Sequence, residues 1–378
     1  MARKSTKFGD AHEKIGKSVG AGKIPRPRKS LRNGKDPIEV TAAVCKYFCR
    51  GYPASQIVEL MKTEQGVHMN REEPYHYLAF AATNGWLTFD APHEYTMRDD
   101  LKSWCGWLAD FDVVHTSVFE DVAGHAAEML MSMMQRWHVR NPDKKDIHVG
   151  VAGGHAMRKL CQAFARLLRR PTPDLPDMIV FQAMVTGFDV RDPRTDPNSF
   201  FTFFFDNPAM QVETGFVGFR APAFVPSERM PELMQFEGIR EAFDAAKELN
   251  IVVTSGSCWV DDHSLLHRFM QVDPKSLQEL QDAGCVGDML WRPVGPSGPI
   301  EIPTSKRAMT LLELSDLQQG IQDGNLEVLL VLGPCGGCGR PKREILGPVL
   351  SARPPMITHL VVDSLSARAL LGREPGTT

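Results

Sequence analysis

The sequence predicts a small helical domain followed by a larger α/β domain with a mostly parallel sheet. From residue 147 onward, short apolar, β-forming runs alternate with segments of helical spacing. This alternation is the pattern of a parallel sheet that helices cover on both faces. At Gly153-Gly154, a strand pattern passes through two glycines directly into a helix pattern. The smaller domain is predicted by three short helical patterns between residues 37 and 84.

Composition places the chain among ordinary globular proteins. It has 378 residues, 43% hydrophobic and 24% charged, and this length has room for roughly two domains. No window approaches the ~18 consecutive apolar residues of a membrane span, and the first residues lack the apolar region of a signal peptide. A chain of this length can bury a large core without disulfides, so its eight cysteines do not require an oxidising compartment. We therefore expect a cytoplasmic protein with no membrane partner.

Residues 1–35 form a basic arm in front of an acidic body. They contain eleven lysine or arginine residues and two acidic ones, a net charge of +9, and the remaining chain carries −12. The arm has no apolar period and is expected to be disordered. This distribution favours a nucleic-acid partner, because lysine and arginine neutralise phosphates. A solvated tail with no partner is the alternative.

Residues 36–98 have the pattern of a winged helix-turn-helix domain, in which three short helices precede a β-hairpin. Another three-helix domain is the alternative, and the basic arm favours the DNA-binding one. The expected helices are Pro37–Cys49, Ser55–Thr63 and Asn70–Asn84. The expected hairpin strands are Trp86–Phe89 and Tyr95–Met97.

Residues 99–121 are expected to be a linker, and residues 122–378 the α/β domain. This domain begins with a methionine-rich helix over Val122–Trp137, whose apolar stripe indicates core packing or a subunit contact. The further strands are expected at Ile147–Ala152, Met178–Thr186, Phe200–Phe205, Ile251–Ser255, Glu327–Leu332 and Thr358–Val362. The further helices are expected at His155–Leu168, Ile239–Leu249, Pro274–Ala283, Leu311–Ile321, Pro341–Leu350 and Ser364–Leu371.

The glycine turn is the first candidate for a binding site. Ligands of open α/β sheets lie outside the carboxyl ends of the strands, where this chain has Gly153-Gly154-His155. Glycine lets the backbone approach a ligand closely, and the following helix N-terminus presents N–H groups to an anion. A phosphate site and an ordinary tight turn both fit this local pattern. Other segments at expected strand ends are Thr186-Gly187, Gly256-Ser257, Gly333–Lys342 and Asp363.

Six segments resemble, in the same order, the sugar-binding domain of SorC-type bacterial transcriptional regulators. They are Val149–Gly154, Val180–Gly187, Arg220–Val225, Ala283–Asp288, Gly336–Lys342 and Val362–Ala367. The resemblance covers residues 113–372 and implies a relative of the glucosamine-phosphate deaminase and ribose-phosphate isomerase fold. It also implies a regulator that binds double-stranded operator DNA and a sugar phosphate effector, as a homodimer or homotetramer.

The resemblance further implies an effector site. The implied effector-binding residues are Gly153, Gly154, His155, Gln182, Arg268, Asp288 and Lys342. The glycines and His155 would hold the phosphate, and Lys342 and Arg268 would supply cations, although Lys342 is alternatively a surface lysine. Gln182 and Asp288 would bind sugar hydroxyls. His155 stands where the family usually has a hydroxyl residue, so either a protonated His155 replaces that donor or it only caps the helix.

The third helix of the small domain resembles the recognition helix of the same family. The implied DNA-binding residues are Asn70, Arg71, Tyr75 and His76. Asn70 replaces a usual serine, His76 a usual arginine, and Pro74 an apolar residue. Residues 36–98 carry five basic and eight acidic side chains, whereas a phosphate-binding domain should be basic. Either the arm supplies the missing charge or the domain has lost ordinary operator binding.

Cys335 and Cys338 form a CxxC pair just before an expected helix. Zinc would need two more ligands, and Cys45 and Cys49 belong to the other domain. A redox-active pair is a second alternative. We expect instead small residues that fill a tight loop, and we assign no metal and no cofactor.

Two other functions fit parts of the sequence. A sugar-phosphate isomerase or deaminase of the same fold would need acid and base groups. The available residues are Glu213, Asp261, Asp262, His263 and Lys342. A nucleotide-binding protein ranks last, because the glycine spacing after Val149 does not meet the dinucleotide fingerprint. The sequence thus predicts a ligand-binding regulator, not an enzyme, and we assign no catalytic residue.

Overall fold

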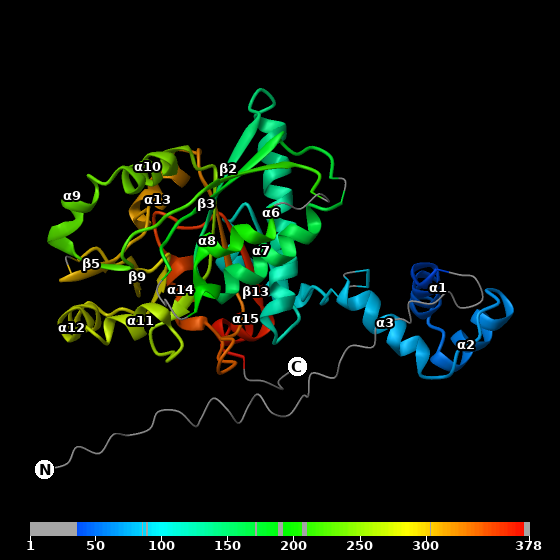
Figure 1. The fold of residues 1–378 in the computed structure, drawn as a ribbon. Helices are drawn as coiled ribbons and strands as arrows, with labels where there is room; N and C mark the ends of the chain where they lie inside the picture. Colours follow the sequence, from blue (N-terminus) through cyan, green and yellow to red (C-terminus); the bar gives the residue numbers. More distant parts are fainter. Residues whose placement is uncertain are drawn as a thin grey trace, which may run out of the picture. The chain divides into compact units, whose positions relative to one another are not determined.

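The computed structural model describes residues 36–84, 86–87, 90–170, 172–187, 192–205, 210–302 and 304–373. The chain forms two units, which divide between Phe89 and Asp90 (Figure 1). The basic arm lies outside the described residues. The division corrects the expected boundary at residue 98 and the expected linker over 99–121. That segment contains strand β1 (Asp110–Val114), which pairs in parallel with β13 (His359–Asp363).

The first unit contains the three predicted helices. They are α1 (Pro37–Cys49), α2 (Ala54–Thr63) and α3 (Glu73–Thr83). α1 begins where the Asp36 carboxylate accepts a hydrogen bond of 2.8 Å from the N–H of Ile38. Apolar side chains of the helices meet in one small core, which includes Val44, Ile57 and Met61.

The predicted hairpin of the first unit is wrong in its second strand. Tyr95–Met97 is the start of helix α4 (Tyr95–Asp100), which belongs to the second unit. Met97 is buried in the core of that unit, and this packing outweighs the β-propensity of Tyr95 and Thr96. Trp86 and Leu87 form a bend, because both of their N–H groups donate to the Ala81 carbonyl. Thr88 and Phe89 lie outside the described residues.

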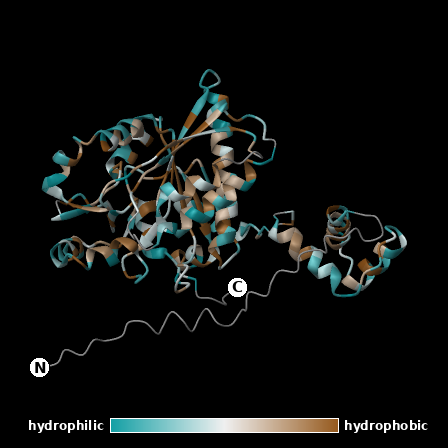
Figure 2. Cartoon of the chain, in the orientation of Figure 1, coloured by the Kyte–Doolittle hydropathy of each residue, from teal (hydrophilic) through white to brown (hydrophobic). Residues whose placement is uncertain are grey.

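The second unit is built around a seven-stranded sheet in which every neighbouring pair is parallel, as predicted. The strand order is β1-β13-β12-β6-β2-β3-β4. The strands not yet given are β2 (Asp146–Val151), β3 (Met178–Ala183), β4 (Glu213–Val217), β6 (Ile251–Thr254) and β12 (Glu327–Leu332). Figure 2 shows hydrophobic residues concentrated in the central strands, as expected where helices cover both faces.

Right-handed crossovers place helices on both faces of this sheet. The connections through α6 and α7 run toward β3, whereas the connection through α14 runs from β12 back toward β1. Figure 1 shows α6 and α7 side by side. The main helices are α6 (Phe119–Arg140), α7 (His155–Leu167), α10 (Glu237–Ala245), α11 (Leu265–Met270), α12 (Pro274–Asp282), α13 (Leu314–Gln322), α14 (Arg343–Ser351) and α15 (Ser364–Leu370). The methionine stripe of α6 is buried in the core, including Met133 and Met134.

The predicted strand Phe200–Phe205 is wrong. This segment contains the end of helix α8 (Pro197–Phe200) and the 3₁₀ turn η2 (Phe201–Phe203). The Asp196 carboxylate caps α8 by accepting the N–H of Asn198 at 2.9 Å, and Pro197 follows at the first helical position. This start signal outweighs the β-propensity of the phenylalanines. Phe204 stacks on Phe181 of β3, with ring centroids 4.4 Å apart.

Two small antiparallel sheets complete the second unit. One contains β7 (Gly256–Cys258), β8 (Gly287–Met289), β9 (Arg292–Gly295) and β10 (Gly298–Pro299). The other pairs β5 (Phe224–Pro226) with β11 (Lys306–Ala308). Among the described residues, none of the helices combines the length and apolar character required to span a bilayer.

Candidate functional site

A cavity of about 670 Å³ lies at the carboxyl ends of the parallel strands. Its walls come from segments that follow four strands of the sheet. They are Ser117–Glu120 after β1, Ala152–Ala156 after β2, Ser255–Ser257 after β6 and several residues of Pro334–Lys342 after β12. Carboxyl ends of parallel strands meet at one edge of a sheet, which explains why distant segments share this cavity.

The glycine turn forms one wall of the cavity. A β-carbon on Gly153 would lie 2.9 Å from the Thr195 carbonyl oxygen and 3.0 Å from Trp291, so no side chain fits there without a shift. Gly154 has φ 104° and ψ 165°, a backbone conformation that essentially only glycine adopts. Both glycines are therefore needed for the turn itself.

The hydrogen bonding of this turn corrects one part of the prediction. The Gly154 N–H donates to the Thr195 carbonyl at 2.8 Å, so it is not available to a ligand. The N–H groups of the first turn of α7, from His155 onward, have no acceptor within the helix. These groups, rather than the Gly154 N–H, are the N–H donors of the loop that remain without a helical acceptor.

The position of His155 bears on its predicted role as a cation. Its Nε2 atom lies 3.5 Å from the Asp192 carboxylate, and its side chain is largely exposed. Partial burial lowers the pKa of His155 below its ordinary value, although Asp192 raises it. This direction of the pKa shift disfavours a protonated His155 as the replacement for a hydroxyl donor.

Lys342 lies inside the cavity wall rather than on an open surface. Its ammonium donates a hydrogen bond of 2.6 Å to the Gly256 carbonyl, and its N–H donates to the Ser366 hydroxyl at 3.0 Å. These bonds hold the residue where the loop after β12 meets the end of β6. The positive charge of Lys342 is thus fixed at the strand ends.

Asp288 and Arg268 both line the same cavity. Asp288 is buried in β8 and accepts hydrogen bonds from the hydroxyls of Ser257 and Ser264. Burial raises the pKa of Asp288 to about 6, against the effect of these hydroxyls and of Lys342. Within the described part of the chain, the Arg268 guanidinium makes no hydrogen bond or ion pair. The lining of the cavity therefore includes an unpaired guanidinium and a buried carboxyl group.

Gln182 does not belong to the site, which corrects the prediction. It lies inside strand β3, one residue before the strand ends, and its side chain is fully buried. Its Nε2 atom donates to the Ala242 carbonyl at 2.7 Å and so holds α10 against the sheet. Gln182 lines no part of the cavity, because it points from a face of the sheet rather than from its carboxyl edge.

Two parts of the cavity were not predicted from the sequence. Ser255 and Ser264 supply hydroxyl groups beside Ser257, which was already expected at this strand end, and the polar run after the buried strand β6 was a visible signal for them. The second part is the two-residue turn between β8 and β9, formed by Leu290 (φ 54°) and Trp291 (φ 57°). Both residues line the cavity in a strained conformation that favours asparagine or glycine, so their sequence gave no turn signal.

The acid and base groups considered for an enzyme do not all lie at the cavity. Glu213 opens strand β4 and so lies at the opposite end of the sheet from the cavity. Asp262 does not line the cavity, whereas Asp261, His263 and Lys342 do.

The residues predicted to contact DNA lie at the start of α3 in the first unit. Arg71, Tyr75 and His76 have exposed side chains. The Asn70 side chain accepts the N–H groups of Glu72 and Glu73, each at 3.0 Å. The Asn70 side chain therefore stabilises the turn that leads into α3, and its amide oxygen is already occupied. The exposed Glu72 remains adjacent to this surface.

No family model matches the chain, and no curated protein matches its sequence. Among solved structures, the full-length sorbitol operon regulator SorC from Klebsiella pneumoniae is 16% identical, with a TM-score of 0.60, and the match covers 89% of this chain and 99% of that one.

Two shorter structures are also similar. A DeoR family transcriptional regulator from Listeria monocytogenes is 18% identical, with a TM-score of 0.51, and the match covers 73% of this chain and 98% of that one. A transcriptional regulator from Streptococcus pneumoniae TIGR4 is 14% identical, with a TM-score of 0.55 and coverage of 74% and 96%. The chain therefore has an α/β fold with an N-terminal helical unit. That fold is also found in the SorC structure, as the motifs resembling SorC-type regulators predicted, and in the DeoR family structure.

Proposed function

We propose that this chain is a transcriptional regulator whose second unit binds a phosphorylated sugar. The main support for the proposal is that the cavity is lined both by positively charged side chains and by groups that hydrogen-bond to hydroxyls. Lys342 and Arg268 offer cations to a phosphate, while Asp288 and the neighbouring serines offer groups to hydroxyls. A volume of about 670 Å³ lies within the range of small-molecule sites.

Two observations support a regulator over an isomerase or deaminase. The similar solved structures described above carry the names of transcriptional regulators, and one of them matches 89% of this chain. In addition, Glu213 lies away from the cavity, and the Lys342 ammonium is already hydrogen-bonded to a backbone carbonyl. The ligand would act by favouring one arrangement of the chain, which changes its affinity for DNA.

The first unit would contact double-stranded DNA through Arg71, Tyr75 and His76, and the basic arm would add the charge that α3 lacks. A homodimer or homotetramer in the cytoplasm would present two such units to paired half-sites. The net negative charge of residues 36–98 makes the arm essential to this proposal.

A thermal-shift experiment tests the effector part of the proposal. The full-length chain is heated with a panel of hexose and pentose phosphates, with the matching free sugars and with inorganic phosphate. At least one sugar phosphate should raise the midpoint more than its free sugar or phosphate alone, because specific ligands stabilise the folded state. No shift with any phosphorylated sugar would contradict the effector assignment.

Electrophoretic retardation tests the DNA part separately. The full-length chain should retard a fragment of its own upstream DNA at low salt, and the retardation should weaken as salt is added. A chain that begins at residue 36 should bind much more weakly. If the full-length chain retards no duplex at low salt, the regulator proposal fails, and turnover of a stabilising sugar phosphate would favour the enzyme instead.

A further inference from the structure

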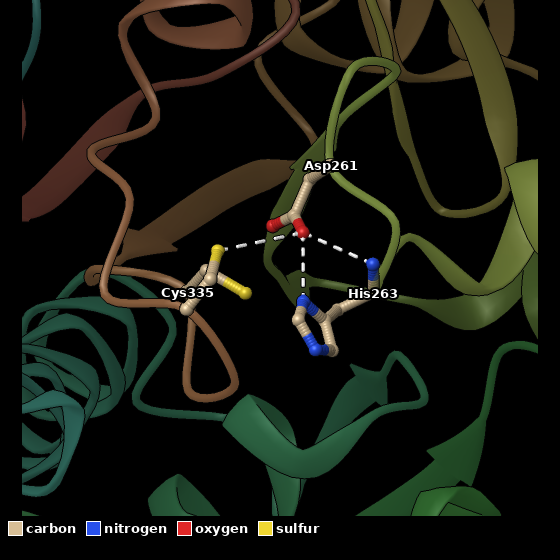
Figure 3. Close-up of side chains that lie close together, drawn as sticks. Asp261, His263 and Cys335 are labelled. Atoms are coloured by element: carbon tan, nitrogen blue, oxygen red, sulfur yellow. Dashed lines mark hydrogen bonds and ion pairs between the residues drawn. The ribbon is translucent and has the colours of Figure 1, made fainter. Parts of the chain in front are cut away.

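Four side chains with metal-binding atoms converge at the rim of the cavity. They are Asp261 and His263, in the loop after β7, and Cys335 and Cys338, in the loop after β12. One ligand atom from each residue lies within 4.8 Å of the ligand atoms of the other three. Figure 3 shows Asp261, His263 and Cys335 directed toward one another across the two loops. The CxxC pair thus has the two further ligands that the sequence analysis could not find.

A single carboxylate oxygen lies at the centre of this cluster. The Oδ1 atom of Asp261 accepts hydrogen bonds of 3.0 Å from both the N–H and the Nδ1 of His263. The Cys338 thiol lies 3.7 Å from the same oxygen, and the Cys335 thiol also donates to Asp261 (Figure 3). Ring and thiol protons therefore point into the space that the ligand atoms share.

The loop after β12 is shaped to hold its two sulfur atoms. The backbone N–H groups of Gly337 and Cys338 donate to the Cys335 sulfur. The Gly339 N–H donates to the Cys335 carbonyl at 2.8 Å, with Gly339 at φ 70°. These N–H groups fix the position of the Cys335 sulfur. Burial raises the pKa of its thiol to about 11, so a metal ion has to displace the thiol proton.

The two loops also hold each other in place. A β-carbon on Gly337 would lie 2.4 Å from Nε2 of His263, so the imidazole rests directly on the glycine backbone. The Arg340 guanidinium donates to the Val260 carbonyl at 3.0 Å. Asp261 and Cys335 are buried, whereas His263 and Cys338 are exposed, which leaves a route for an ion from solvent. The four ligands are thus positioned by contacts other than those among themselves.

We propose that Asp261, His263, Cys335 and Cys338 form a tetrahedral site for Zn²⁺. Thiolate, imidazole and carboxylate ligands suit zinc, whereas calcium and magnesium prefer oxygen ligands alone. In a tetrahedral zinc site, two sulfurs lie about 3.8 Å apart, so the observed separations require only small movements. Binding releases the two thiol protons to solvent, and the ring proton of His263 moves by way of solvent from Nδ1 to Nε2, so that Nδ1 binds the ion.

Four protein ligands leave no open position, so the ion would stabilise structure rather than carry out chemistry. It would join the loop after β7 to the loop that ends at Lys342, and so fix two walls of the effector cavity. The proposal of a zinc site depends only on the four side chains. It does not depend on whether the cavity binds a sugar phosphate.

Metal binding is tested on the full-length chain, purified with a reductant and freed of metal by a chelator. Titration with Co²⁺ should give the visible bands of a tetrahedral ion and a thiolate charge-transfer band, with about one ion bound per chain. Zn²⁺ should displace the Co²⁺ and abolish both signals. A titration without a thiolate band, or with no uptake of either ion, overturns the proposal.

Matched variants locate the site. Cys338→Ser and His263→Ala change exposed residues and should fold, yet each should weaken Co²⁺ binding at least tenfold. Cys49→Ser and His115→Ala change exposed residues outside the cluster and should bind Co²⁺ as the parent does. Unchanged binding in Cys338→Ser, or lost binding in Cys49→Ser, would contradict the assignment. Circular dichroism of each variant confirms folding, and retention of DNA retardation by the metal-free chain separates this test from that of the regulator.

Discussion

The Lys342 ammonium donates a hydrogen bond of 2.6 Å to the Gly256 carbonyl oxygen. This bond joins the loop after β12 to the point where the parallel strand β6 passes into the antiparallel strand β7. It holds a positive charge at the carboxyl edge of the large sheet, beside the buried Asp288.

Lys342→Gln should weaken binding of a sugar phosphate about 10- to 100-fold. The amide can still donate to the Gly256 carbonyl, so the loss reports the missing charge, whose hydrogen bond to a phosphate contributes about 1.5–3 kcal/mol. Calorimetric titration with the best ligand of the panel measures the change. Lys247→Ala, an exposed lysine paired with Asp244, is the control and should bind normally. Equal affinity in both variants would exclude Lys342 from the phosphate site.

Gly154→Ala should lower the free energy of unfolding by about 2–3 kcal/mol, because alanine is strained at the backbone angles of this position. Gly124→Ala is the matched control. Gly124 lies within α6, and a β-carbon there meets nothing within 4 Å, so this change should stabilise the chain by about 0.5–1 kcal/mol. Urea unfolding measures both values. A Gly154→Ala variant as stable as the parent would show that the turn relaxes without cost.

The His125–Asp112 pair should make stability depend on pH. His125 Nδ1 lies 2.9 Å from the Asp112 carboxylate, and Nε2 donates to the Ala91 carbonyl at 2.8 Å. The hydrogen bond to Asp112 is the main cause that raises the pKa of His125, and burial opposes it. The protonated ring therefore stabilises the folded state fully below about pH 6.5, and this contribution is lost as pH rises through the folded-state pKa.

His125→Gln tests this dependence. The variant should lose on the order of 1 kcal/mol more of unfolding free energy at pH 5.5 than at pH 8.5, relative to the parent. Asp112→Asn removes the carboxylate partner and should likewise reduce the dependence, although His93 also bonds to that carboxylate. Urea unfolding at the two pH values measures the difference. An equal loss at both pH values would show that the pKa of His125 is not raised in the folded chain.

Asp288→Asn should stabilise the chain while it weakens ligand binding. Burial raises the pKa of Asp288 to about 6, so ionisation disfavours the folded state progressively as pH rises from about 4 to above 6. The variant should gain a few kcal/mol at pH 8 and much less at pH 4, and it should bind a sugar phosphate less tightly. Unfolding at both pH values and calorimetry measure these effects. A gain that does not change with pH would mean that Asp288 is not buried as a titrating carboxyl group.

The parts of the fold that the sequence predicted correctly have strong local causes. The strands β2, β6 and β12 are buried on both faces and therefore appear as continuous apolar runs. Gly154 is recognisable because its backbone angles exclude other residues. Six of the seven predicted effector residues line the cavity, because the carboxyl ends of parallel strands meet at one edge.

The parts that were missed depend on tertiary contacts. Strand β1 contains two aspartates and shows no long apolar run, yet β13 pairs with it. The Leu290-Trp291 turn has no turn-forming residue, and packing around the cavity has to hold it. The approach of Asp261 to Cys335 joins residues far apart in the chain, so their spacing carries no metal-site signature.

The pairing of β1 with β13 has a consequence for how the second unit folds during synthesis. β1 is the first strand of the unit to leave the ribosome, and among the described residues it pairs within the sheet only with β13, the last strand. β1 therefore cannot join the sheet until β13 has been synthesised. Pairing between strands so far apart in the chain slows folding. Because the same pairing brings the two ends of the unit together, a circular permutant that joins them and opens the chain elsewhere should keep the fold.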